Sequence, residues 1–228
     1  MIRLLKYHFL VLLCGLLLLF SYYFFSKEVK RGFMKETDFA VTVKLQEKIN
    51  TSKRLHLVDF IGNVFEGSTF IAGPWMSMGF LGFLTIAAFV NLKKKTINLR
   101  VLLIPVLFGL LVFGEIYGKS VVHHPSPPFF MIKNPTTIFP KYYINEAYSY
   151  PSGHDARAVF ISCVIYFLLT MNYLLRDKRK KLLIISGLTG YVLLVSISRI
   201  YLGHHWLSDV IGGGFLGGSF GIIVLSAL

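Results

Sequence analysis

The chain has 228 residues, of which 54% are hydrophobic and only 15% are charged. Soluble domains average about 25% charged residues, and the apolar residues here come in long blocks, so the composition indicates an integral membrane protein. The net charge of +13 does not make nucleic acid an expected partner, because much of the basic charge lies in short loops between apolar blocks. There it indicates membrane topology and contact with anionic membrane lipids.

Six apolar blocks predict an all-α fold, a single domain (residues 1–228) that forms a bundle of six transmembrane helices. In chain order the predicted spans are residues 4–25, 68–92, 101–118, 153–175, 182–202 and 206–228. Arg3 and Lys6 precede the first span as in a signal peptide. Bulky residues and no small-residue cleavage site follow it, so we expect it to be retained as a helix.

The segment 26–56, after the first span, is mixed and charged. Phe39, Val43 and Ile49 recur in it at roughly helical spacing, which predicts a short amphipathic helix at the membrane surface. A solvated connector fits this pattern equally well. The stretch 57–92 is longer than one span needs. Its first half is polar at Asp59, Asn63 and Glu66, and Gly67, Gly73 and Pro74 offer bends.

The short loops at 93–100 and 176–181 carry four and five basic residues. Basic loops face the cytoplasm, so we expect a multi-pass protein of the cell (inner or plasma) membrane with both termini cytoplasmic. The segment 119–151 contains six of the eight prolines and is predicted to be a structured loop. It shares the extracytoplasmic face with the stretch 198–209, so the ends of spans three to six should meet there.

The last span contains small residues four positions apart, at Gly213, Gly217 and Gly221 and at Gly214 and Gly218. Such spacing lets helices approach closely in lipid. We expect these glycines to pack inside the bundle, and a homodimer contact is the alternative.

The stretch 198–209 lies between two apolar spans and yet carries several ionisable residues, which near a bilayer suggest function. If the part after Gly203 is helical, His205 and Asp209 share a face. Asp209 could then fix the tautomer of His205 and leave its other ring nitrogen free to act as a base or nucleophile. The guanidinium of Arg199 suits phosphate or carboxylate oxygens.

Ser152 and Gly153 open the fourth span, where a hydroxyl and unpaired backbone N–H groups at a helix start can bind an anion. His154 stands beside them, placed to give or take a proton, and Lys119 ends the third span on the same face. Taken singly, these residues have ordinary interpretations as a cap, a turn, an interfacial residue and a snorkelling anchor.

Histidines are concentrated in the outer segments, at His123, His124, His154, His204 and His205. Imidazoles together with Asp209 could instead bind zinc. Such a site would hydrolyse its substrate with a metal-bound hydroxide.

Three motifs occur in order: Lys119-x6-Ser126-Pro127, Pro151-Ser152-Gly153-His154 and Ser198-Arg199-x5-His205-x3-Asp209. Together with the six-span layout, they resemble the type 2 phosphatidic acid phosphatase (PAP2) superfamily of membrane lipid phosphatases. The family pattern is Lys-x6-Arg-Pro, Pro-Ser-Gly-His and Ser-Arg-x5-His-x3-Asp. Ser126 stands in place of the first-motif arginine; His124, Lys133 and Arg157 are candidates to supply the missing charge.

The resemblance implies phosphoryl transfer through a phosphohistidine, without a metal ion or other cofactor. His205 would be the nucleophile, Asp209 its orienting carboxylate and His154 the proton donor and acceptor. The phosphate-binding residues would be Lys119, Ser152, Gly153 and Arg199, with Ser126, Arg157 and His124 as further candidates. The substrate would be a lipid phosphate or diphosphate. A lipid phosphotransferase would use the same residues, and Ser126 leaves a non-catalytic lipid-binding relative as the alternative from another class.

Overall fold

A computed structural model describes residues 2–51, 55–91, 96–97, 99–133, 147–171 and 177–227. These residues are helical except for loops and one antiparallel pair of two-residue strands, β1 (Val90–Asn91) and β2 (Thr96–Ile97). The α-helices are α1 (Ile2–Lys30), α2 (Lys35–Asn50), α3 (Leu55–Ser68), α4 (Pro74–Phe89), α5 (Leu103–Val122), α6 (Gly153–Met171), α7 (Lys178–Tyr201) and α8 (Leu207–Ala227). Two 3₁₀ turns, η1 (Leu99–Leu102) and η2 (Phe129–Met131), precede and follow α5.

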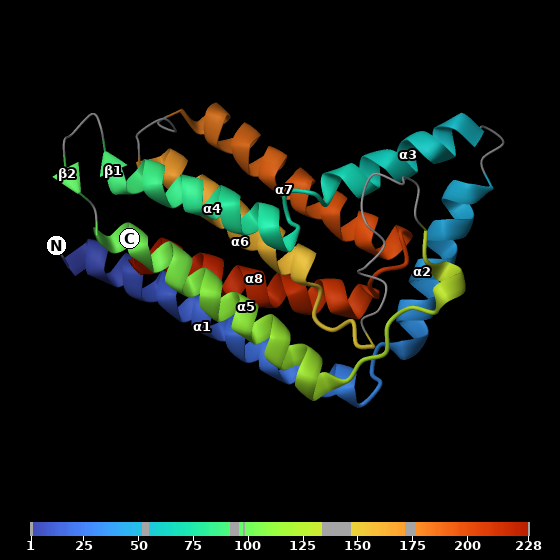
Figure 1. Ribbon diagram of the computed structural model, residues 1–228. Coiled ribbons are helices and arrows are strands. Elements are labelled where there is room, and N and C mark those ends of the chain that lie inside the picture. The colour runs from blue at the N-terminus through green and yellow to red at the C-terminus, as the bar shows by residue number, and fades with distance from the viewer. Residues whose placement is uncertain are drawn as a thin grey trace.

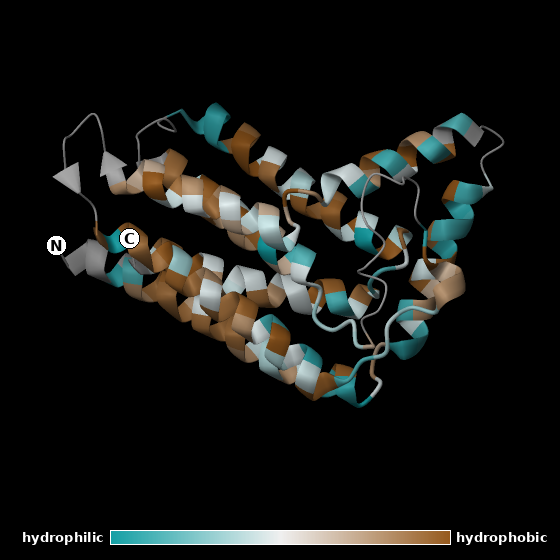
Figure 2. Cartoon of the chain, in the orientation of Figure 1, coloured by the Kyte–Doolittle hydropathy of each residue, from teal (hydrophilic) through white to brown (hydrophobic). Residues whose placement is uncertain are grey.

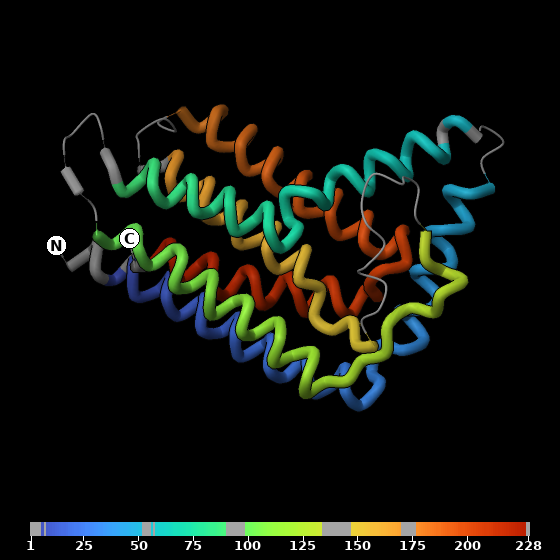
Figure 3. Tube along the Cα trace, in the orientation of Figure 1, coloured from blue at the N-terminus to red at the C-terminus, as the bar shows by residue number. Residues whose placement is uncertain are grey.

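The long helices α1 and α4–α8 run along one another in an elongated bundle (Figure 1). Helices α2 and α3 lie across one end of this bundle, and α1 begins and α8 ends at the opposite end. Helix α8 packs mainly against α1 and α6 and also contacts α5. The tube trace follows α6 and α8 side by side toward the end where α2 lies (Figure 3).

Four of the helices described are long and apolar enough to cross a membrane: His8–Lys30, Leu99–Val122, Lys178–Tyr201 and Leu207–Ser226. Large apolar side chains remain exposed on them, such as Phe113 and Leu183, and hydrophobic colour covers much of the bundle in Figure 2. Lipid is the environment that makes such a surface favourable. The six-span layout stays a prediction, because α6 is not among these four helices and α4 has only 16 residues, a length of about 24 Å at 1.5 Å per residue.

The second predicted span begins later than the sequence suggested. Residues 68–92 were expected to form one helix, but α3 ends at Ser68 and α4 starts at Pro74. Proline is favourable in the first helical position because its missing N–H has no partner there anyway. Helix α7 starts earlier than expected, at Lys178, because the Asp177 side chain accepts a hydrogen bond from the backbone N–H of Arg179 at 2.9 Å. Most of the predicted basic loop 176–181 is thus the first turn of a helix.

The glycines of α8 mostly pack inside the bundle, as predicted. A Cβ at Gly213 or Gly217 would run into backbone atoms of Ser152 or Ala156, respectively, where α6 begins. A Cβ at Gly221 would meet the side chain of Cys163, which is also on α6. These close approaches bring the first turns of α6 and α8 together, and therefore bring together the two motifs that those turns carry. The predicted alternative, a homodimer contact, stays a prediction.

The segment 26–56 is largely helical, but the face that α2 buries is polar. Asp38 and Thr42 are buried while Phe39 is exposed. The side-chain amide of Gln46 donates to the carbonyl oxygens of Met131 and Tyr201, both at 2.8 Å. Helix α2 is therefore hydrogen-bonded to η2 and to the end of α7, beside the segments that carry the sequence motifs.

Candidate active site

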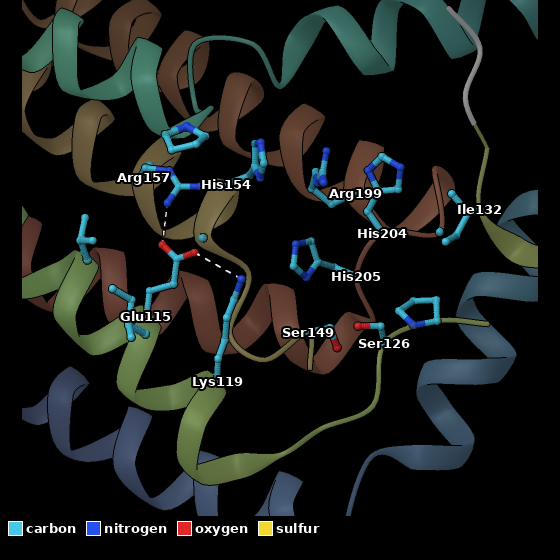
Figure 4. A pocket seen from close by; sticks show the side chains of 16 residues that line it. Glu115, Lys119, Ser126, Ile132, Ser149, His154, Arg157, Arg199, His204 and His205 are labelled. Atoms are coloured by element: carbon cyan, nitrogen blue, oxygen red, sulfur yellow. Dashed lines mark hydrogen bonds and ion pairs between the residues drawn. The ribbon is translucent and has the colours of Figure 1, made fainter. Parts of the chain in front are cut away.

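A pocket of about 290 Å³ lies where the end of α5, the start of α6 and the turn between α7 and α8 meet. It is lined by nine polar or charged side chains together with glycines and apolar residues. Those nine are Glu115, Lys119, Ser126, Ser149, His154, Arg157, Arg199, His204 and His205 (Figure 4). The three motifs, far apart in the sequence, thus contribute to one pocket.

Asp209, the expected orienting carboxylate, lies in the first turn of α8. Its Oδ2 lies 3.6 Å from Nδ1 of His205, an ion-pair distance longer than a hydrogen bond. Its Oδ2 also accepts the backbone N–H of Trp206 at 2.8 Å, as a carboxylate in the third helical position does when it caps a helix start. Because α8 starts at Leu207, His205 precedes the helix, so the cap geometry and not a shared helical face brings the pair together.

His124 lies closer to Asp209 than His205 does. Its Nδ1 makes a 2.9 Å hydrogen bond with Oδ1 of Asp209, and its Nε2 is 3.8 Å from Oδ2 of Asp38. His124 is not among the described residues that line the pocket. The side chain of His124, a candidate phosphate ligand, is therefore placed against Asp209 and not among the described residues that line the pocket.

Asp38, on α2, is a residue that the sequence did not single out. Its two oxygens accept from the backbone N–H and the hydroxyl of Ser208, both at 2.8 Å. Burial raises the pKa of Asp38 above its usual range, and the bonds from Ser208 oppose that shift. Asp38 caps an N–H in the first turn of α8 from another helix. No local spacing could reveal it, because 170 residues separate the partners.

The start of α6 differs from expectation in one respect. Gly153 and His154 line the pocket, but Ser152 is buried and is not among the described lining residues. The Ser152 hydroxyl donates to Oδ2 of Asp155 at 2.6 Å, and Ser196 donates to Oδ1 of Asp155, also at 2.6 Å. In this arrangement Ser152 caps and braces α6, and its hydroxyl is directed to Asp155.

Glu115 is the second residue that the sequence did not single out. Its carboxylate lies 2.5 Å from Nη1 of Arg157 and 3.7 Å from Nζ of Lys119, and Figure 4 shows both cations converging on it. The carboxylate also rests on Gly153, where an added Cβ would overlap it. The four-residue spacing of Glu115 and Lys119 on one helix was the signal available in the sequence.

Arg157 is held on two sides, because its Nε also donates to the carbonyl oxygen of Ala72 at 2.8 Å. Arg199 and Ser126 line the pocket as expected. His204, which is not one of the specified residues of the three motifs, also lines it. Burial, and secondarily the charge of Arg199, holds the pKa of His204 well below its usual range. His204 is therefore neutral at pH 7.

Two sequence-based expectations, Lys133 as a substitute cation and the zinc site, find no support in the described part of the pocket. Lys133 has its Nζ 5.1 Å from the ring centroid of Tyr201 and is not a described lining residue of the pocket. The zinc alternative lacks a ligand set among the described residues, since none of their His, Cys, Asp and Glu side chains form a group of three or more that could hold a metal ion.

The fold and the pocket define a class: a multi-pass helical membrane protein with a cationic, histidine-bearing pocket at one end of its bundle. The model of the PAP2 superfamily matches residues 98–228, more than half of the chain. The chain belongs to this superfamily.

Two curated relatives are similar over parts of the chain. Phosphatidylglycerophosphatase B of Bacillus subtilis (strain 168) is 42% identical over 73 residues, which are 32% of this chain and 35% of that protein. Undecaprenyl-diphosphatase of Sulfolobus acidocaldarius is 35% identical over 133 residues, which are 58% of this chain and 56% of that protein. The matched segments thus span about a third and somewhat over half of the relatives' lengths.

Two solved structures share the fold. The crystal structure of a transmembrane PAP2-type phosphatidylglycerolphosphate phosphatase from Bacillus subtilis gives a TM-score of 0.71 at 20% identity, covering 92% of this chain and 93% of that one. The crystal structure of Aquifex aeolicus LpxE gives a TM-score of 0.54 at 24% identity, covering 82% of this chain and 96% of that one.

Proposed function

We propose that the protein is a membrane lipid phosphatase that hydrolyses a phosphate or diphosphate head group through a phosphohistidine intermediate on His205. The observation that carries the proposal is the pocket itself, in which Lys119 and Arg199 meet His154 and His205. The names of the two curated relatives, a phosphatidylglycerophosphatase and an undecaprenyl-diphosphatase, support the same substrate class. An amphiphile of this kind reaches a pocket at the end of a membrane bundle while its tails stay in lipid.

In the first step, the lone pair of Nε2 of His205 attacks phosphorus and the bond from phosphorus to the leaving-group oxygen breaks. His154 delivers a proton to that oxygen. Asp209, 3.6 Å from Nδ1 of His205, orients the ring and stabilises the positive charge that it gains. Lys119 and Arg199 offset the charge on the non-bridging oxygens.

In the second step, water attacks phosphorus while His154 takes a proton from it. The nitrogen–phosphorus bond breaks, its electron pair returns to Nε2 of His205, and inorganic phosphate leaves. The Gly153 N–H at the start of α6 adds a donor to the phosphate oxygens. Ser152 joins it only after its hydroxyl turns away from Asp155, to which it is bound at 2.6 Å. No metal ion or cofactor takes part in either step.

The test is release of phosphate by the purified protein from a set of lipid phosphates. We expect activity in the wild type that EDTA leaves unchanged, and none in His205→Ala. Activity that is lost in EDTA and restored by zinc would favour the metal-bound hydroxide instead. Full activity in His205→Ala would exclude the covalent route.

We also propose that the pocket faces the extracytoplasmic side of the cell membrane, with both termini in the cytoplasm. The basic segments 93–100 and 176–181 support this orientation. A cysteine introduced as Phe130→Cys, at an exposed position of η2, should react in intact cells with a maleimide that cannot cross membranes. One introduced as Arg179→Cys, at the start of α7, should react only after the cells are lysed. The reverse pattern would invert the orientation.

A further inference from the structure

Three cationic side chains and one acidic side chain meet in the pocket. Among the described residues that line it, Lys119, Arg157 and Arg199 are cations and Glu115 is the one acid. Two neighbouring carboxylates have other partners: Asp155 accepts from two serines, and Asp209 is bound by His124 and Trp206. The charged groups that line the pocket therefore sum to about two positive charges before any histidine is protonated.

Glu115 makes part of the pocket unfavourable for a second anion. Its carboxylate lies beside the start of α6, against Gly153, and it compensates Arg157 at 2.5 Å. Arg157 is also committed to the Ala72 carbonyl oxygen at 2.8 Å, so two contacts fix its guanidinium. An additional phosphate group on this side would approach the Glu115 carboxylate, and Arg157 is already paired with that carboxylate, so the pair offers no net positive charge to a second phosphate.

Ser126 supplies no compensating charge. It lines the pocket at the position where the family pattern places an arginine. A phosphomonoester carries close to two negative charges at neutral pH, which the charges lining this pocket balance. A second phosphate group adds further negative charge, for which the described lining residues hold no further cation.

We infer that the pocket is selective for a lipid phosphomonoester over a lipid diphosphate, and that Glu115 and Ser126 set this preference. The inference rests on the proposed phosphatase function and narrows its substrate class. Ser126 acts by the absence of a charge, and Glu115 acts by repelling a second phosphate group and by pairing with Arg157. The products are then a lipid alcohol and inorganic phosphate, so the reaction that supplies the substrate must be one that makes a lipid monophosphate.

The experiment compares farnesyl phosphate with farnesyl diphosphate, which share a tail and differ in the number of phosphate groups. We expect kcat/KM of the purified full-length protein to favour the monophosphate by about tenfold or more, the effect of roughly 1.4 kcal/mol. Ser126→Arg should raise kcat/KM for the diphosphate and narrow the ratio. Glu115→Gln should narrow it as well, since it removes the charge and keeps the shape.

Ser120→Arg is the matched control, because Ser120 is exposed on α5 one residue after Lys119 and is not among the described residues that line the pocket. It adds the same charge nearby and should leave the ratio unchanged. Competitive inhibition by inorganic phosphate and by pyrophosphate gives a second readout: Ser126→Arg should strengthen inhibition by pyrophosphate more than inhibition by phosphate. This readout needs only one active substrate.

The outcomes separate the two proposals. A wild type that cleaves the diphosphate as well as or better than the monophosphate would overturn the inference and leave the phosphatase function standing. An unchanged ratio in both Ser126→Arg and Glu115→Gln would also overturn the assignment to these residues. Release of phosphate from neither farnesyl lipid and from none of the lipid phosphates in the first test would refute the proposed function and the inference with it.

Discussion

Replacing Gly217 by alanine should separate α6, which carries His154, from α8, which follows His205 directly. A Cβ on Gly217 would overlap the carbonyl oxygen of Ala156 and lie 2.9 Å from its carbonyl carbon and its Cα. Carbon atoms prefer separations of about 3.5–4.0 Å, so α6 and α8 must move apart by roughly 1 Å. Backbone atoms cannot rotate out of the way as a side chain can.

The expected cost follows from this overlap. Overpacking typically costs about 1–3 kcal/mol, and a clash with backbone belongs at the upper end. Alanine recovers about 1 kcal/mol as the better helix former, which leaves a net loss of about 2 kcal/mol. For a chain of this size that loss lowers the melting temperature by roughly 4–8 °C. Because Ala156 lies two residues after His154, a shift of this size should also lower kcat by up to about 100-fold.

Gly214→Ala provides the control, because a Cβ at Gly214 meets nothing within 4 Å. It shares the gain in helix propensity without the clash, so thermal unfolding in detergent should place it at or above the wild type, with unchanged activity. If Gly217→Ala matches Gly214→Ala in both melting temperature and kcat, the close approach of α6 and α8 does not position the site. If Gly214→Ala is the damaging change, a contact between two copies of the chain becomes the better explanation.

Two further predictions concern buried groups near the site. Asp38→Ala leaves two buried donors of Ser208 without their acceptor, which should lower the free energy of unfolding by about 2–4 kcal/mol and lower kcat. Glu36→Ala, at an exposed position of the same helix, should change neither quantity. Equal melting temperatures and equal kcat for the two variants would contradict this role of Asp38. The lowered pKa of His204 means that the unfolded chain binds the extra proton first, so stability should fall as the pH drops below about 6.5. His204→Leu should lose less stability than the wild type between pH 7 and 5, and an identical loss would show that His204 is not buried as described.

Much of the fold followed from local patterns. Long apolar blocks identified most of the helices, and the glycine spacing of α8 identified its packing face. The residues at which helices start and end were harder to predict, because capping residues determine them. Asp177 caps the start of α7 within a basic run that was predicted to be a loop. Pro74 was recognised as a bend. The sequence did not show that α4 starts at this proline, which makes the helix shorter than the predicted span 68–92.

The candidate site was predictable where motif residues supply the side chains, as with His154, Arg199 and His205. Two other features arise only from the tertiary arrangement. Asp209 has two imidazoles within reach, and sequence spacing indicated only His205, whereas the loop after α5 brings His124 closer. Asp38 approaches from a helix whose pattern suggested contact with the membrane surface, because a buried polar face does not stand out in a charged segment.

The central claim, a covalent phosphohistidine on His205, is tested most directly by trapping the intermediate. Purified protein is mixed with a lipid substrate carrying ³²P in the phosphate group and is quenched in alkaline detergent within milliseconds. We expect protein-bound label that is stable in alkali, labile in acid and located by peptide mapping on the segment containing His205, and no label in His205→Ala. Label of the same amount in His205→Ala, or turnover of substrate by that variant at the wild-type rate, would contradict the account.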